Sequence, residues 1–280
     1  MDSCCFASVI FEGNVPFLPK FLTSLQEQTD TNFTLLLFND GVGKLETHLD
    51  SYELPFKIIE TSGSIAEVRA QLLSYVANSD FDNTVFGDTD DFFAPNRIEL
   101  SKQLLQQHAI IAHDVWLVNE LGQLLEPNYW KYRPELLQGI SYKNLVHYNV
   151  LGLGNTAIQN KVLPKEFKIP ADLIAVDWYV FSNLLKEGIR AFFTAETYIY
   201  YRQYEGNTIG LKKLTLQRFE REVSVKLQHY RAMAQVDTQF ESLATSFGNL
   251  HAKINTLSEA EISTYMQQQD HPFWWEQVQL

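Results

Sequence analysis

Cysteine is scarce in this 280-residue sequence, and a long apolar run is missing. The two cysteines, Cys4 and Cys5, are adjacent, and neighbours in a strand point to opposite faces, so a disulfide framework is excluded. No apolar run approaches the roughly 18 residues that a membrane-spanning helix needs. The first residues also lack the basic start of a signal peptide. We therefore expect a cytoplasmic protein, with peripheral contact at the inner face of the membrane as the alternative.

Basic residues are also in deficit, with 22 Lys and Arg against 34 Asp and Glu and a net charge of −12. This balance argues against a nucleic acid partner, because phosphate backbones are bound by clustered Lys and Arg. An acidic protein can still bind a phosphorylated small molecule when a divalent cation supplies positive charge. The sequence has no P-loop motif, and its seven histidines show no metal-ligand spacing.

Hydrophobic residues make up 45% of the chain, enough for the core of one large α/β domain or of a core domain with an appendage. In the first half, short apolar runs alternate with amphipathic stretches. This alternation predicts a mostly parallel sheet with helices on both faces, and a ligand site beyond the carboxyl ends of the strands. The expected strands are 5–11, 34–38, 56–59 and 84–86, and the expected helices are 17–25, 65–76 and 95–107.

The pattern changes after residue 109. A hairpin is expected over 110–125, with further strands near 191–193 and 198–201. From about residue 211 the apolar residues recur at helical spacing, and Ser258 with Glu261 predicts a capping box. Such stripes need a partner surface. We expect these helices to fold back on the rest of the chain. A homodimer is the second expectation and reversible membrane contact the third. The apolar cluster Pro272-Phe273-Trp274-Trp275 could touch lipid headgroups or equally dock on the core.

The most informative motif is a carboxylate cluster, Asp88, Asp90 and Asp91, directly after the expected strand 84–86. Carboxylates this close repel one another unless a cation or a helix N-terminus compensates. Mg²⁺ or Mn²⁺, held by one or two carboxylates and the phosphates of a substrate, provides that compensation. The alternative is an aspartate helix cap with solvated neighbours.

Five motifs in order resemble landmarks of the inverting glycosyltransferases of the GT-A fold, the large family 2 group that uses nucleotide-sugars. They are 9–14 (VIFEGN), 21–29 (FLTSLQEQT), 38–41 (FNDG), 68–69 (VR) and 86–91 (FGDTDD). Two later stretches, 175–178 (AVDW) and 200–208 (YYRQYEGNT), resemble further family motifs. Val176 stands where the family has glutamate, and Tyr204 where it has histidine.

The resemblance implies a GT-A, Rossmann-like domain over 1–210, with a nucleotide-sugar-binding half (1–108) and an acceptor-side half (109–210). Residues 211–280 lie outside it and are expected to form a helical appendage. The implied nucleotide-sugar contacts come from Phe11, Asp40, Arg69, Asp88 and Thr89. Among them, Asp40 would accept a hydrogen bond from the uracil or thymine base of the nucleotide. Asp90, with Asp88, would hold Mn²⁺ or Mg²⁺. As an alternative, the Asp40 side chain could form a hydrogen bond with the backbone of its own turn. Arg69 could instead form an ion pair on the helix surface with Glu67 or Glu99.

Asp177 is the implied general base, which would take the proton of an attacking hydroxyl. The alternative is an Asp cap for the helix that follows. Trp178, Arg202 and Tyr204 are expected on the acceptor or diphosphate side. Trp178 would there provide a stacking floor for a sugar, or else belong to the core.

The resemblance thus implies metal-assisted, inverting transfer of a sugar from a nucleotide-sugar, a UDP-sugar first, to a hydroxyl of a glycan, lipid-linked or other polysaccharide precursor. Two other functions stay open. A haloacid-dehalogenase-type phosphatase has a similar Asp-x-Asp motif, but its nucleophile follows the first strand, whereas Asp88 follows the fourth. A nucleotide-sugar or glycan-binding module without catalysis would be consistent with the residues at 176 and 204.

Overall fold

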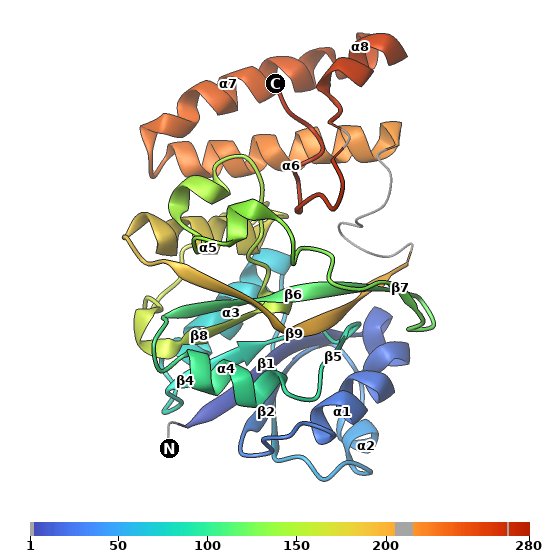
Figure 1. Ribbon diagram of the computed structural model, residues 1–280, viewed down its shortest axis with the longest axis vertical. Helices are drawn as coiled ribbons and strands as arrows, with labels where there is room; N and C mark the ends of the chain where they lie inside the picture. The colour runs from blue at the N-terminus through green and yellow to red at the C-terminus, as the bar shows by residue number, and fades with distance from the viewer. Residues whose placement is uncertain (1–2, 205–214, 268) are drawn as a thin grey trace.

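The computed structural model describes residues 3–204, 215–267 and 269–280, and its described strands form one curled sheet (Figure 1). Their order across the sheet is β3-β2-β1-β4-β8-β6-β9-β5, with β7 paired to β6. The strands are β1 (Cys4–Phe11), β2 (Thr34–Asp40), β3 (Phe56–Glu60), β4 (Asn83–Phe86), β5 (Phe92–Phe93), β6 (Ile110–Asn119), β7 (Leu124–Glu126), β8 (Thr156–Gln159) and β9 (Ala191–Gln203). The helices are α1 (Leu18–Gln26), α2 (Glu46–Leu49), α3 (Ile65–Ala77), α4 (Arg97–Leu104), α5 (Val176–Lys186), α6 (Leu216–Ala234), α7 (Glu241–Lys253) and α8 (Glu259–Tyr265).

The strands of the first half are parallel. β1 pairs in parallel with both β2 and β4, and β2 pairs in parallel with β3. Phe11, the last residue of β1, is in register with Asp40, the last residue of β2. The carboxyl ends of these strands therefore meet at one edge of the sheet, where ligands of such sheets bind. This arrangement confirms the predicted α/β fold class.

The second half adds strands of both directions. β8 is antiparallel to β4 and to β6, and β6 forms the expected hairpin with β7. β9 runs parallel to β6 as one strand through both segments that the sequence predicted, with a register shift opposite His113 and Asp114. The sheet is continuous because β8 joins the two halves.

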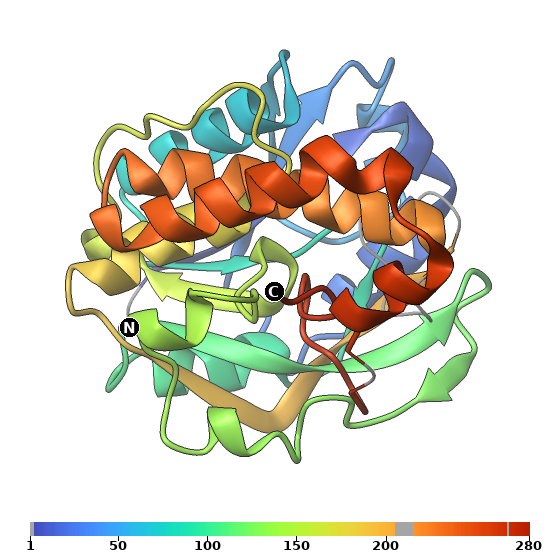
Figure 2. The same ribbon diagram turned by 90° about the horizontal axis from the view of Figure 1, so that it is seen from above.

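Helices α6 and α7 lie side by side over α5, on the face of the molecule away from α1 and α2 (Figures 1 and 2). The indole of Trp178 in α5 stacks on His229 of α6 at a centroid distance of 3.7 Å. The helices beyond residue 215 thus fold back on the rest of the chain, the first of the three arrangements expected. Ser258 and Glu261 form the predicted capping box of α8. In the described ranges, no helix combines the length and apolarity needed to cross a membrane.

The cluster Pro272-Phe273-Trp274-Trp275 docks on the core, one of the two places expected for it. All three aromatic residues are buried, at 1%, 6% and 5% exposure, so they are not available to lipid headgroups. Phe273 and Trp274 pack edge to face on Trp130, which follows β7. This segment is therefore part of the core.

Candidate active site

A cleft of about 400 Å³ opens at the carboxyl edge of the parallel strands. Phe11 and Asp40 reach it from the ends of β1 and β2, and Asp88 and Asp90 reach it from the loop after β4. Asp177, in the first turn of α5, faces the same cleft. Residues that are distant in sequence are thus brought together because consecutive parallel strands end at one edge.

Asp88 is held by an ion pair. The Nη2 atom of Arg69 donates to its Oδ1 atom at 2.6 Å, and both side chains are partly exposed to the cleft. Arg69 therefore pairs neither with Glu67, which caps α3 at Ser64, nor with Glu99. This geometry brings a positive charge to the carboxylate cluster at the cleft edge.

Asp90 lies close to a phenol. The hydroxyl of Tyr204 donates to its Oδ2 atom at 2.9 Å. Burial, with the charge of Asp88 second, raises the pKa of Asp90 to about 6. Tyr204 thus contacts Asp90, a predicted metal ligand. It stands at the position where the family 2 glycosyltransferases have histidine. The rest of that motif, residues 205–208, lies outside the described residues.

Asp91 faces inward from the same loop and is 1% exposed. Its Oδ1 atom accepts the backbone N–H of Arg202 at 2.8 Å, while its Oδ2 atom has no hydrogen-bond partner among the described residues. Burial raises the pKa of Asp91 well above its ordinary value. This buried oxygen lacks a partner among the described residues and lies near the carboxylates of Asp88 and Asp90, so a cation would be stabilised beside it.

The side chains of two residues in the predicted site, Arg202 and Thr89, support the carboxylate loop. Arg202 is buried, and its Nε atom donates to the carbonyl oxygen of Asp90 at 2.6 Å, so it holds the loop in place behind the cleft. Thr89 is fully buried, donates to the carbonyl oxygen of Val9 and accepts from Asn14, both at 3.0 Å. Neither side chain lines the cleft. Each ties the carboxylate loop to a neighbouring strand.

Asp177 is oriented by a backbone contact from another loop. Its Oδ2 atom accepts the N–H of Leu153 at 3.0 Å, and the N-cap of α5 is Ala175. It is therefore not the side-chain cap that was its alternative. Burial, the largest effect, raises the pKa of Asp177, and Arg69 partly opposes this. A buried carboxylate with a raised pKa in a cleft has the properties of a general base.

Trp178, the neighbour of Asp177, belongs to the core. Its ring is fully buried between α5 and α6, and its Nε1 atom donates to the carbonyl oxygen of Leu145 at 2.6 Å. Of the two places expected for this residue, the structure shows the core: the ring stacks on His229 and is 0% exposed, although it lies behind the cleft wall.

The residues fit a divalent cation that binds together with a diphosphate. Asp88 and Asp90 are two carboxylates at one edge of the cleft, and the Cα of Gly154 lies so close that a Cβ there would be 2.6 Å from Asp88 Oδ2. Within the described ranges, no cluster of three or more His, Cys, Asp or Glu side chains would hold a metal ion alone. Mg²⁺ and Mn²⁺ sites of one or two carboxylates use substrate phosphates as the remaining ligands.

Sequence reasoning missed several residues that line the cleft. They include Asn14, Asn149, Gly152, Gly154, Tyr201, Trp274 and Trp275. The two tryptophans are the least expected, because the segment that carries them lies outside every motif. Their position follows from long-range packing, for which the sequence has no periodic signal.

Neither protein-family models nor curated proteins give a match to this chain. Solved structures do share its fold. TarS from S. aureus, in complex with UDP-GlcNAc, has a TM-score of 0.60 at 14% identity over 89% of this chain and 72% of that one. The mannosyltransferase PcManGT from Pyrobaculum calidifontis, in complex with GDP-Man and Mn²⁺, has a TM-score of 0.61 at 12% identity over 94% and 78%. At these identities the similarity establishes the fold.

Proposed function

We propose that this chain is a metal-assisted glycosyltransferase of the family 2 type, which transfers a sugar from a nucleoside diphosphate sugar to a hydroxyl acceptor with inversion. The carrying observation is that one cleft holds the Asp88–Asp90 pair at the end of β4 together with Asp40 and Asp177. Solved structures of the same fold contain UDP-GlcNAc, or GDP-Man with Mn²⁺, which supports this choice of donor class.

Asp40 is suited to recognise the base of the nucleotide. The turn after β2 is closed by Asn39, whose Oδ1 atom accepts the N–H of Val42 at 2.9 Å. The carboxylate of Asp40 is not needed for that turn, and it lines the cleft beside Phe11. A carboxylate at a rigid strand end can accept a hydrogen bond from the N–H edge of uracil or thymine.

The diphosphate would lie at the Asp88–Asp90 pair. The cation held there would neutralise the charge that develops on the leaving nucleoside diphosphate. Arg69 adds a positive charge from α3, 2.6 Å from Asp88. In the absence of the cation, this arginine compensates part of the carboxylate charge.

Asp177 would take the proton of the acceptor hydroxyl as that oxygen attacks the anomeric carbon. Its bond to the N–H of Leu153 fixes the orientation of the carboxylate in the cleft. Direct displacement on the face opposite the diphosphate inverts the anomeric centre and requires no covalent enzyme intermediate.

A thermal-shift screen of UDP-, dTDP- and GDP-sugars, with and without Mn²⁺, tests this proposal. A ligand at about 100 times its Kd stabilises the folded state by about 2.7 kcal/mol, so a donor would raise the Tm when Mn²⁺ is present. Release of the nucleoside diphosphate then distinguishes an enzyme from a binding module. No shift with any donor in the presence of Mn²⁺ would contradict the proposal.

A further inference from the structure

Arg97, the first residue of α4, is a fully buried cation with 0% exposure. The carbon of its guanidinium lies 4.6 Å from the ring centroid of Phe93. No ion pair in the described part of the chain involves this arginine. Burial lowers the pKa of Arg97 to about 9, although the charges of Asp91 and Asp88 partly oppose this. Burying a charge without a partner carboxylate is unfavourable, so Arg97 calls for a role beyond packing.

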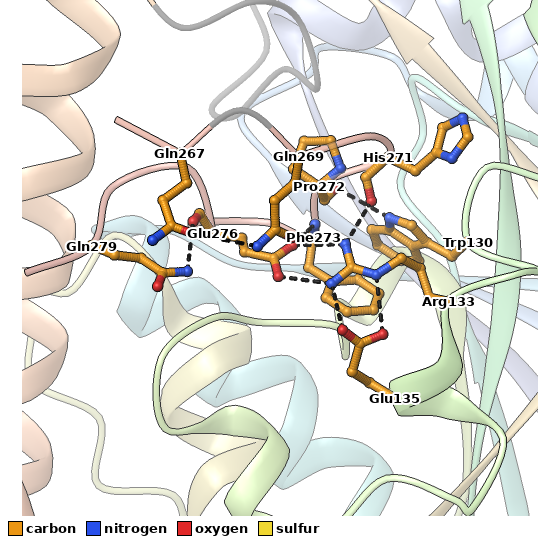
Figure 3. Close-up of polar contacts among 10 residues, drawn as sticks. All are labelled: Trp130, Arg133, Glu135, Gln267, Gln269, His271, Pro272, Phe273, Glu276 and Gln279. Carbon is orange, nitrogen blue, oxygen red and sulfur yellow. Dashed lines mark hydrogen bonds and ion pairs between the residues drawn. The ribbon is translucent and has the colours of Figure 1, made fainter. Parts of the chain in front are cut away.

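Arg133 shows the usual arrangement of a buried arginine (Figure 3). It is 9% exposed, and its Nη2 atom lies 2.7 Å from Glu276 Oε1 and 3.0 Å from Glu135 Oε1. Glu276 belongs to residues 272–278, which we call the aromatic strap, and this ion pair anchors the strap to the segment after β7. The charge of Arg133 is thus balanced by carboxylates. The donors of Arg97 go to backbone carbonyl groups instead.

The two carbonyl groups that Arg97 contacts belong to the two sides of the candidate site. Its Nη2 atom donates to the carbonyl oxygen of Phe86, the last residue of β4, at 2.6 Å and to that of Gly154 at 2.9 Å. The carboxylate loop follows β4 directly. Gly154 lies in residues 152–155, which we call the base loop because its second residue donates an N–H to Asp177. One guanidinium nitrogen therefore connects the carboxylate loop with the base loop.

The two loops are in close contact at the point that Arg97 joins. A Cβ at Gly154 would lie 2.6 Å from Asp88 Oδ2 and 3.9 Å from Asp91 Oδ2, so a side chain there would force a shift. Among the described residues, no other hydrogen bond connects the base loop with residues 86–91. The Nη1 atom of Arg97 is also buried and has no hydrogen-bond partner in the described ranges. The position of one loop relative to the other thus depends on this arginine.

The carboxylate loop has further anchors that do not involve the base loop. Arg202 donates to the carbonyl oxygen of Asp90 from β9, and Thr89 donates to that of Val9 in β1. These bonds should keep the carboxylates, and with them the nucleotide site, in place when Arg97 is replaced. The loss of Arg97 should instead release the base loop from its position beside that site.

We propose that Arg97 is a positioning residue, which holds the base loop against the carboxylate loop so that Asp177 faces the sugar of the bound donor. The inference rests on the proposed function and adds to it a residue that lies outside the cleft. A general base acts only within hydrogen-bond reach of the proton that it takes, so a small shift of the base loop lowers the rate. A guanidinium suits this role because its planar fork donates in fixed directions.

Hydrogen exchange of the full chain without ligands, followed by NMR, tests the connection itself in Arg97→Met and Arg97→Lys. In Arg97→Met, the amide of Leu153 should exchange about tenfold faster or more, the size of a lost hydrogen bond to a charged group. The amides of β2 should stay within about twofold. Arg97→Lys keeps the charge without the fork, so it should show a smaller increase at Leu153. An unchanged exchange rate of Leu153 in Arg97→Met, or in Arg97→Lys if the first variant does not fold, would overturn the inference.

The kinetics separate positioning from a purely structural role. They are measured in Mn²⁺ with the nucleotide-sugar that the thermal-shift screen selects. Arg97→Met should lower kcat by about tenfold or more, the effect of a misplaced catalytic group, while the Kd of the nucleoside diphosphate in Mn²⁺ stays within about threefold. In a protein that already carries Asp177→Asn, the same substitution should have little further effect on kcat, because the base is absent.

The matched control is Arg190→Met, because Arg190 also donates to a backbone carbonyl oxygen, that of Gln138 at 2.9 Å, but is exposed and outside the cleft. It should change neither the exchange of Leu153 nor kcat. An unchanged kcat in Arg97→Met, or an equal loss of kcat with and without Asp177→Asn, would overturn the inference and leave the proposed function standing. Absence of turnover by the unchanged protein with every donor would refute the proposed function, and the role of Arg97 with it, while faster exchange at Leu153 would still show the connection.

Discussion

Replacing Asp177 with asparagine separates a role as general base from a structural role. In the unchanged protein the N–H of Leu153 lies 3.0 Å from Asp177 Oδ2, and asparagine keeps a carbonyl oxygen that can accept this hydrogen bond. The fold of α5 and its neighbouring loop should survive. The amide cannot take a proton, so the turnover rate should fall by about two to four orders of magnitude, the usual contribution of a general base. This loss corresponds to about 3 to 5 kcal/mol of activation free energy.

The pH dependence gives a second readout of the same variant. Burial raises the pKa of Asp177, and the carboxylate is the form that acts as a base. The rate should therefore rise with pH through this raised pKa and be lost as the carboxyl is protonated at lower pH. Asp177→Asn should lack that acidic limb.

The assay is release of nucleoside diphosphate from the donor in the presence of acceptor, with the donor Kd measured separately by calorimetry. Asp172→Asn is the control, because Asp172 is exposed, close in sequence and outside the cleft. It should change neither quantity. Equal losses of donor affinity and rate in Asp177→Asn, or an unchanged rate, would refute the base assignment.

Two further substitutions probe the carboxylate loop and the aromatic strap. Gly154→Ala places a methyl group 2.6 Å from Asp88 Oδ2, so it should lower the Mn²⁺-dependent rise in Tm. The control is Gly43→Ala, whose methyl group meets no atom within 4 Å and should leave that rise unchanged. An unchanged Mn²⁺ response in Gly154→Ala would refute this position for the cation. Arg133→Met leaves the carboxylate of Glu276 buried without its partner and should lower the free energy of unfolding by about 3 to 5 kcal/mol in urea titrations. A change below about 1 kcal/mol, the size of an exposed pair, would show that this ion pair does not anchor the strap.

The parallel half of the fold could be predicted because its strands are short apolar runs that end in polar turns. The same logic predicted a ligand site at the carboxyl ends of these strands, where Asp88 and Asp90 lie, whereas the role of Asp40 came from the motif resemblance. Asp177 required the motif resemblance, because a carboxylate in the first turn of a helix has no distinctive local pattern. Its approach to the cleft depends on how α5 packs.

The direction in which side chains point could not be predicted from the sequence. Thr89 and Arg202 lie in the right motifs, but they face the protein and support the loop. Local sequence does not determine whether a residue beside a site faces the ligand or the core. The aromatic strap was missed for a different reason: the contact of Trp274 with Gly152 joins residues far apart in sequence, and no spacing rule anticipates it.

Calorimetric titration with the nucleoside diphosphate of the donor tests the central claim most directly, since that claim joins the carboxylate pair, the cation and the diphosphate. The titration is performed in Mn²⁺ and in EDTA, for the unchanged protein and for Asp90→Asn. We expect tight binding in Mn²⁺ that weakens by about tenfold or more, at least 1.4 kcal/mol, in EDTA and in the variant. Equal affinity under all of these conditions would contradict the account.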